Sequence, residues 1–157
     1  MNREKLLPFE ITLPLSVRTY DIDFAGIVSN IVFIRWLEDL RCEILVNHLP
    51  IEEQLQNGVA PLLIQTQIDY KKSITLVDKP IGRMWISKLK TMKWFVNAEI
   101  SVDGMVTATA EQTGCFIDLT TRRPVPVPAE LQQKYLEYHQ KQGSGVNSLQ
   151  GSHYELL

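Results

Sequence analysis

An acidic segment that contains a glycine, residues 20–30, holds the side chains best suited to chemistry. Asp21 and Asp23 precede Gly26, and Asn30, the expected N-cap, opens the next predicted helix. The first turn of a helix has free amide donors and a partial positive charge. This order therefore places a carboxylate beside donors that can hold a developing oxyanion. The alternative is an ordinary acidic loop, in which the Asp side chains serve turns and caps.

The sequence does not predict a metal site, a serine nucleophile or a reactive cysteine. The histidines, His48, His139 and His153, have no His or Cys partner at ligand spacing, so the sequence predicts no metal site. The chain has no Gly-x-Ser-x-Gly motif, which removes the usual signal of a serine nucleophile. Cys42 lies in a helical pattern and Cys115 in a strand pattern, and both are interpreted as structural thiols.

The composition is that of one ordinary globular domain: 157 residues, 45% hydrophobic and 22% charged. Sixteen Lys and Arg against eighteen Asp and Glu give a net charge of −2, which argues against nucleic acid as the partner. No window approaches the roughly 20 consecutive apolar residues of a membrane span, and the first residues show no apolar signal region. With only two cysteines, a reducing, cytoplasmic location is expected.

Hydrophobic spacing predicts one long helix and a run of strands. In residues 30–47 the apolar side chains recur at intervals of three and four, as one face of a helix requires: Phe33, Leu37, Leu40 and Ile44. Alternating apolar and polar residues predict strands over 9–20, 62–70, 81–90, 93–102 and 105–119. Asp103-Gly104 suits a two-residue hairpin turn, and Pro14 indicates an edge position or a bulge in the first strand.

The order of these elements predicts an α+β fold. Consecutive strands without helices between them pair antiparallel, and a helix with a full apolar stripe needs a sheet against which to bury it. Pro124, Pro126 and Pro128 are expected to end the sheet before a closing helix over 129–141. Since the following residues are polar and rich in Gly and Ser, we predict one domain over 1–141 and a mobile tail over 142–157.

The acidic segment also resembles a family signature. The motif Asp-x-x-Gly-Ile-Val-x-Asn at 23–30, followed by Ile-Arg-Trp-Leu-Glu at 34–38 and by Arg41, is similar to that of hotdog-fold acyl-CoA thioesterases of the 4-hydroxybenzoyl-CoA thioesterase type. The order of strand, loop, central helix and antiparallel strands also matches that family over residues 9–140. The resemblance implies a hotdog fold, in which a curved antiparallel sheet wraps around the central helix.

The resemblance implies a role for each matching residue. Asp23 matches the family's catalytic carboxylate, which attacks the thioester carbonyl or activates a water. The backbone N–H of Asn30 matches the group that faces the thioester oxygen, and Gly26 matches the glycine that lets the loop turn. Many relatives have His after this glycine, where this chain has Ile27, so a histidine-assisted reaction is not expected. Asp21 is interpreted as structural.

The resemblance further implies the substrate and the assembly. Coenzyme A carries phosphates. Relatives that act on aromatic acyl groups bind these phosphates with basic residues at turns comparable to those that hold Lys90, Lys93, Arg122 and Arg123. A solvated surface charge is the alternative for each of the four. The expected substrate is an acyl-CoA or an acyl-carrier protein, and the reaction would use no metal or redox cofactor. A homodimer or homotetramer with sites at the subunit interface is expected.

Other functions on the same fold stay open at this point. A non-catalytic module that only binds acyl-CoA has no need of a carboxylate beside the thioester, so Asp23 favours hydrolysis. A dehydratase usually needs a His near the helix, and His48 lies at the far end of the predicted one. A role in assembly alone is a third alternative. The residues do not specify whether the acyl group is aromatic, short or long.

Overall fold

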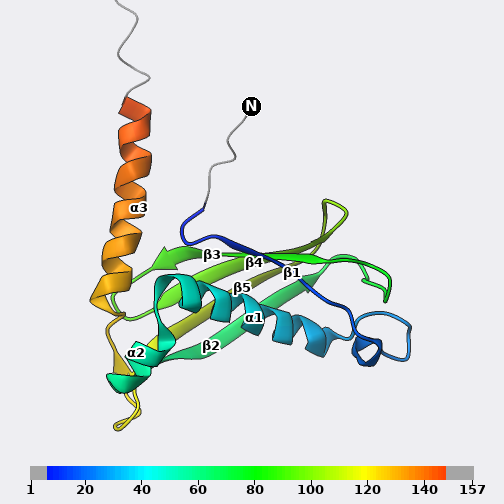
Figure 1. Cartoon of the computed structure of the whole chain (residues 1–157), viewed down its shortest axis with the longest axis horizontal. Coiled ribbons are helices and arrows are strands. Elements are labelled where there is room, and N and C mark those ends of the chain that lie inside the picture. The colour runs from blue at the N-terminus through cyan, green and yellow to red at the C-terminus, as the bar shows by residue number, and fades with distance from the viewer. Residues whose placement is uncertain (1–6, 148–157) are drawn as a thin grey trace, which may run out of the picture.

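A curved antiparallel sheet wraps around one long helix (Figure 1). The computed structural model of the chain describes residues 7–147. In chain order the elements are β1 (Ile11–Pro14), a 3-10 turn η1 (Thr19–Asp21), α1 (Asn30–His48), α2 (Ile51–Gln56), β2 (Val59–Tyr70), β3 (Ile81–Leu89), β4 (Trp94–Val102), β5 (Met105–Asp118), β6 (Pro124–Val125) and α3 (Ala129–Asn147).

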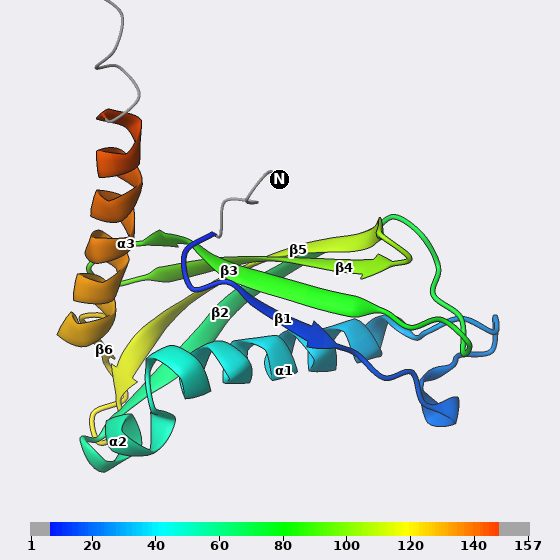
Figure 2. The ribbon, with the colours of Figure 1, turned by 45° about the horizontal axis from the view of Figure 1, so that its top comes forward.

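The strands form a single sheet in the order β1-β3-β4-β5-β2, with β6 paired to the end of β5. Every pairing is antiparallel. The sheet curves so that α1 lies along its concave face (Figure 2), whereas α3 packs on the domain with its first turns, through Leu131, and then projects from it. This arrangement confirms the expected α+β hotdog fold.

The apolar stripe of α1 faces the sheet as its spacing predicts. Phe33, Leu37, Leu40 and Ile44 are buried, and Trp36 widens the same stripe. They pack against alternate residues of the central strands, because successive strand side chains point to opposite faces. On β4 these inward residues are those that the sequence alternation identifies, namely Trp94, Val96, Ala98 and Ile100. Burial of this one helix face therefore holds the helix on the sheet.

Turn chemistry sets the ends of several elements. Asp103 and Gly104 have φ values of 50° and 76°, which confirms the expected two-residue hairpin turn between β4 and β5. Gly58 has a φ of 75° and follows the last turn of α2, where a left-handed residue ends a helix. Pro14 closes β1, which within the described part of the chain pairs with β3 alone, so of the two expected placements, an edge position or a bulge, the edge position is confirmed.

The main differences from the predicted elements concern the first strand, the proline segment and the last helix. The ladder of the first strand covers only Ile11–Pro14, since Leu15 leaves it and donates its amide to the carbonyl of Pro80 at 2.9 Å. The segment Pro124–Val125, where the sheet was expected to stop, adds a short strand beside Phe116 and Ile117. Helix α3 continues to Asn147, past the expected end at residue 141. Most of the predicted tail, 148–157, lies outside the described residues.

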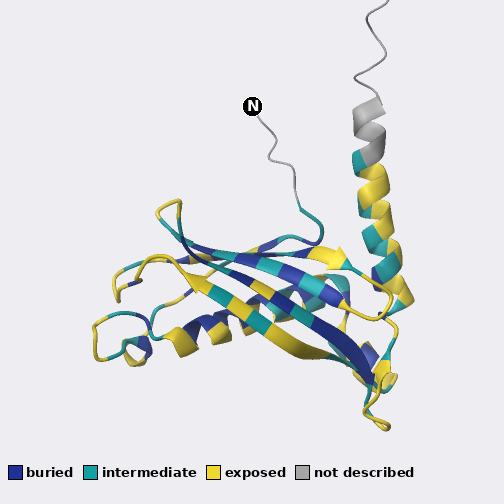
Figure 3. Ribbon diagram, turned by 180° about the vertical axis from the view of Figure 1, so that it is seen from behind, coloured by how far each residue is buried: buried dark blue, intermediate teal, exposed yellow. Residues whose placement is uncertain are grey.

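Strand β2 forms a free edge of the sheet, because among residues 7–147 it pairs with β5 alone. Large apolar side chains on it are exposed, among them Leu62, Leu63 and Ile64. Seen from behind, the strand stays largely exposed along its length, whereas β4 and β5 alternate with buried positions (Figure 3). An exposed apolar edge of this kind is normally covered in a native protein.

Candidate active site

The acidic loop that precedes α1 is a small closed hairpin. Ile22 and Val28 form an antiparallel bridge, and the amide of Asp23 donates to the carbonyl of Ile27 at 2.9 Å. The amide of Gly26 returns to the carbonyl of Asp23 at 3.0 Å. Gly26 has a φ of 78° with open space where a Cβ would stand, so backbone conformation rather than packing requires a glycine here.

The carboxylate of Asp23 is anchored on one oxygen. Its Oδ1 accepts from the amide of Ala25 at 2.8 Å and from that of Ile27 at 3.5 Å. Within residues 7–147, no hydrogen bond to its Oδ2 occurs. The side chain is half-buried. The loop therefore orients the carboxylate and leaves one oxygen available for a reacting group.

Asp21 has a different environment from Asp23. It is buried, its Oδ2 accepts from the amide of Arg18 at 2.8 Å, and its carbonyl accepts from the amide of Ser29 at 2.8 Å. At the end of the loop, the amide of Val28 donates to the carbonyl of Ile74, in the segment between β2 and β3, at 2.8 Å. These bonds support the structural interpretation of Asp21, which connects the start of the loop to the start of α1.

Helix α1 begins one residue earlier than the cap prediction places it. Ser29 is the N-cap, in an extended conformation, and its carbonyl accepts from the amide of Val32 at 2.9 Å. The prediction of Asn30 as N-cap is therefore wrong, because the bond from Ser29 to Asp21 already turns the chain into the helix. Asn30 is the first helical residue. In the described chain its amide and that of Ile31 donate to no protein acceptor.

A tyrosine that the sequence did not single out lies beside this helix end. The hydroxyl of Tyr70 donates to the carbonyl of Asn30 at 3.4 Å, and its ring packs edge-on against Phe33 with 5.0 Å between centroids. Partial burial raises the pKa of Tyr70. Tyr70 sits 40 residues from Asn30 in the chain, and no local motif relates the two.

The four predicted phosphate-binding residues are exposed at two turns. Lys90 and Lys93 bracket the turn from β3 to β4, where the amide of Lys90 donates to the carbonyl of Lys93 at 2.8 Å. Arg122 and Arg123 lie in the turn from β5 to β6, and Arg122 has a φ of 60°. Each pair is therefore brought together by a turn.

These turns lie at the other end of the sheet from Asp23. The acidic loop lies near the Met105 end of β5. Its Val28 amide donates to the carbonyl of Ile74, and in the same segment the amides of Lys71 and Lys72 donate to the carbonyl of Thr107 on β5. The basic turns meet the Asp118 end of that strand. Helix α1, which runs between the two ends, has 19 residues and spans about 28 Å. One chain therefore does not bring Asp23 and these cations together.

A groove of about 250 Å³ opens between the second half of α1 and the sheet. Most of its lining is apolar and includes Ile44, Leu62, Trp94 and Phe116, while Glu38 and Arg41 are its charged members. The indole of Trp94 lies over Gly114, where a Cβ would stand 2.0 Å from its ring. The groove lies at the same end of the sheet as the basic turns.

No group of three or more His, Cys, Asp and Glu side chains within residues 7–147 could hold a metal ion. No described helix is long and apolar enough to cross a membrane. The candidate site thus combines an anchored carboxylate, free helix amides and, at the far end of the sheet, an apolar groove with basic turns beside it.

Comparison with known proteins places this arrangement in context. The model of a family described as the Thioesterase-like superfamily matches residues 17–135. The long-chain acyl-CoA thioesterase FadM of Escherichia coli (strain K12) is 25% identical over 122 residues, which cover 76% of this chain and 92% of that protein.

Solved structures share the fold. A 1,4-dihydroxy-2-naphthoyl-CoA thioesterase from Synechocystis superposes with a TM-score of 0.73 at 22% identity, covering 82% of this chain and 96% of that one. A predicted thioesterase from Bacillus stearothermophilus gives 0.74 at 21% identity over the same shares. At these identities the likeness establishes the common fold.

Proposed function

Because the chain belongs to the thioesterase-like superfamily, we propose that it hydrolyses an acyl-CoA thioester to the free acid and coenzyme A, with Asp23 as the catalytic carboxylate. The observation that carries the proposal is the placement of Asp23. A carboxylate anchored on one oxygen stands in the loop that leads into α1, whose first amides have no protein acceptor. That pair of features suits attack on a carbonyl.

The reaction would use the helix amides for the charge that develops. When the carbonyl carbon is attacked, its oxygen becomes an oxyanion, and the amide of Asn30 donates to it with the help of the positive end of α1. Asp23 either attacks the carbon itself or takes a proton from the attacking water. The C–S bond then breaks, and coenzyme A leaves as a thiolate that takes up a proton. If Asp23 itself attacks, the acyl group is left on its carboxylate as a mixed anhydride, and a water hydrolyses this anhydride to release the acid and restore Asp23.

We propose that the working unit contains two copies of the chain. The support is the free edge of β2 with its exposed apolar side chains, which a second β2 would cover by pairing antiparallel. Antiparallel pairing sets the Val59 end of one β2 beside the Tyr70 end of the other. Asp23 of one copy then approaches the groove of its partner copy.

Such a pairing also brings Asp23 toward the partner's basic turns. Lys90, Lys93, Arg122 and Arg123 would then contact the phosphates of coenzyme A, as the resemblance implies, while the acyl group enters the groove. Acyl-carrier protein is the second candidate for the thiol carrier. The exposure of four cations at two turns favours a phosphate-rich carrier such as coenzyme A.

A thiol-release assay tests the proposal. The full chain is incubated with acyl-CoAs that range from acetyl to palmitoyl and include benzoyl derivatives, and free thiol is measured with a chromogenic disulfide. We expect turnover on at least one substrate. If acyl-CoA binds, as titration calorimetry would report, but no substrate releases thiol, the chain is a binding module and the proposed hydrolysis is wrong.

A further inference from the structure

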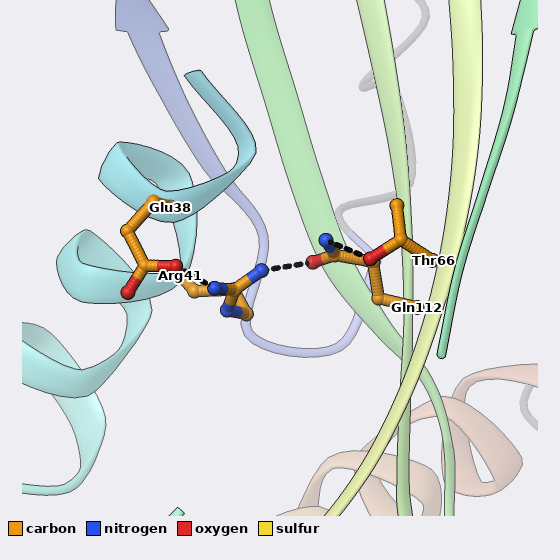
Figure 4. Close-up of polar contacts among 4 residues, drawn as sticks. All are labelled: Glu38, Arg41, Thr66 and Gln112. Atoms are coloured by element: carbon orange, nitrogen blue, oxygen red, sulfur yellow. Dashed lines mark hydrogen bonds and ion pairs between the residues drawn. The ribbon is translucent and has the colours of Figure 1, made fainter. Parts of the chain in front are cut away.

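A chain of polar contacts crosses the space between α1 and the sheet at the inner side of the groove. Arg41 of α1 donates from Nη1 to Oε1 of Gln112 on β5 at 2.5 Å, and Nε2 of Gln112 donates to Oγ1 of Thr66 on β2 at 3.0 Å. Arg41 also forms an ion pair with Glu38. Figure 4 shows Arg41 reaching from the helix toward Gln112, with Thr66 on the other side of Gln112. We call Arg41, Gln112 and Thr66 the crossbar.

Gln112, the middle member of the crossbar, is buried, and Arg41 and Thr66 at its two ends are half-buried. Gln112 is 2% exposed and the side chain of Arg41 is 14% exposed. Burial lowers the pKa of Arg41. Buried polar groups are costly unless they are paired, and apolar side chains of similar volume often serve stability equally well. Stability alone therefore gives little reason for a polar row at this place.

The register of the sheet places the crossbar between two different regions. Gln112 pairs with Thr66 on one side and with Val96 on the other. Toward the Asp118 end of β5 lies the groove, with Leu62, Trp94 and Phe116. The crossbar thus stands where the groove ends along the sheet.

The region on the other side of the crossbar is closed but has small side chains. Ala98 and Ala110 pair with each other in the next inward row, and Ala108 follows. Phe33 and Leu37 of α1 cover these alanines. A chain that extended beyond the crossbar would therefore meet alanines and apolar side chains, with Gln112 and Arg41 as the obstacle in front of them.

We propose that the crossbar is the end wall of the acyl chamber and sets the longest acyl chain that the enzyme accepts. The proposal rests on the proposed function, since it takes the groove as the place of the acyl group. An acyl chain that enters from the β2 edge runs along Leu62 and Trp94 until it meets Arg41. A longer chain must displace the crossbar and leave buried hydrogen-bonding groups without partners, which disfavours its binding.

The test compares two substitutions of one residue. Gln112→Ala removes the amide and the volume of the wall, whereas Gln112→Leu removes the amide and keeps most of the volume. The kcat/KM of each is measured on straight-chain acyl-CoAs of increasing length. For the unmodified protein we expect a fall of roughly tenfold or more between the last chain that fits and the longer ones.

The two variants should then differ. Gln112→Ala is expected to move the fall to longer chains, mainly through a lower KM for them, and Gln112→Leu, which loses the hydrogen bonds but keeps most of the volume, is expected to move it less. Gln54→Ala is the matched control, because Gln54 is a buried glutamine of α2 outside the groove. It should change the melting temperature but not the length profile.

The outcomes separate this proposal from the proposed function. If the unmodified protein hydrolyses acyl-CoA with a flat length profile, or if Gln112→Ala leaves the fall in place, the end wall is wrong while hydrolysis stands. If no substrate is hydrolysed, the same comparison is made on dissociation constants for acyl-CoA. If Gln112→Ala does not fold, Arg41→Met, which keeps an unbranched stem and removes the guanidinium, replaces it and should also move the fall to longer chains.

Discussion

Two aspartates in the same loop differ in their surroundings, and their environments separate a structural role from a chemical one. Asp21 is buried and bonds to the amide of Arg18, so it belongs to the support of the loop. Asp23 is half-buried with one anchored oxygen. Because both residues are aspartates, the same substitution at each position shows how the surroundings of the carboxylate determine its role.

Asp23→Asn is expected to lower kcat by about 10²-fold or more on the best substrate, because it removes both the negative charge and the basicity. Binding of acyl-CoA should survive. Asp21→Asn is the matched control: it should lower the melting temperature, since a buried carboxylate bond is weakened, and change kcat less. A kcat near that of the unmodified protein for Asp23→Asn would remove the catalytic assignment.

The basic turns give a prediction about KM. Neutralising Lys90, Lys93, Arg122 and Arg123 to Gln should raise KM for acyl-CoA more than it lowers kcat, because a phosphate contact is shared by the ground state and the transition state. The effect should shrink on a short pantetheine thioester that lacks the nucleotide. Equal losses on the two substrates would instead indicate a folding defect or a catalytic role.

At the scale of the elements, prediction succeeded where apolar residues recur at a regular spacing along a whole helix or strand. The stripe from Phe33 to Ile44 identifies α1 because only a helix buries residues at that spacing. The strand β6 was missed because prolines normally end pairing, yet Pro124 needs no amide donor at the sheet end where it lies. The cap at Ser29 depends on a bond to Asp21 that local spacing does not reveal.

The crossbar and Tyr70 were missed for a related reason. Arg41 and Gln112 are 71 residues apart, and Tyr70 is 40 residues from Asn30. Each contact exists only after α1 has docked on the sheet. The Asp23 motif, in contrast, lies within eight consecutive residues and could be identified from the sequence. Short local motifs can therefore be identified from the sequence, whereas contacts between distant residues, such as those of the crossbar, can be identified only from the tertiary structure.

Packing around Gly114 of β5 gives a prediction about stability. A Cβ at this position would stand 2.0 Å from Trp94 and 2.4 Å from the carbonyl of Leu62. Gly114→Ala should therefore destabilise the fold by about 1–3 kcal/mol, the usual range for an overpacked core. Thr113→Ala, on the neighbouring and less buried position, should change stability less. Urea unfolding followed by tryptophan fluorescence measures both, and equal stability of the two variants would contradict the packing argument.

The end of α1 gives a prediction about pH. Burial, and then the charge of Lys134, lower the pKa of His48, whose ring packs edge-on against Phe9. The folded state therefore binds this proton less readily than the unfolded state. The stability that His48 contributes is fully present above its unfolded pKa of about 6.5 and is lost as the pH falls below that value.

The measurement is the urea midpoint at pH 8 and at pH 5.5. The unmodified protein should lose more stability between these values than His48→Gln does, because the variant has no titrating group at this place. Absolute stability of the variant is not the readout, since the contact with Phe9 also changes. An equal loss in both proteins would show that His48 does not contribute to the pH dependence.

At the scale of the whole molecule, one chain holds the parts of the proposed site apart. The anchored carboxylate lies at one end of the sheet, and the groove and the basic turns lie at the other. Exposed apolar residues follow the edge between them, on β2 and on the outer face of α1 at Ile31 and Ile34. The proposed pairing of two β2 edges accounts for the separation and for the exposed apolar residues of β2, because it covers that edge and places the Asp23 end of one copy beside the groove end of the other.

This pairing makes a prediction that no single-chain site can satisfy. Two inactive variants are prepared: Asp23→Asn, and the chain with Lys90, Lys93, Arg122 and Arg123 changed to Gln, assayed at low substrate concentration. If each site takes Asp23 from one copy and its cations from the other, a mixed dimer contains one site with both sets intact. After subunit exchange at equal amounts, half of the dimers are mixed and half of their sites work. We therefore expect about a quarter of the unmodified activity to return.

Two measurements make this result decisive. Light scattering must give a dimer or a larger assembly for the unmixed protein, and a stable monomer at micromolar concentration would contradict the pairing outright. Native mass spectrometry of the mixture then reports the share of mixed dimers. If mixed dimers form and the activity stays at the average of the two variants, Asp23 and the four cations do not meet across the interface. If the activity rises in proportion to the mixed dimers, each site is built from two copies of the chain, and the separation of its parts within one chain is explained by the symmetry of the pair.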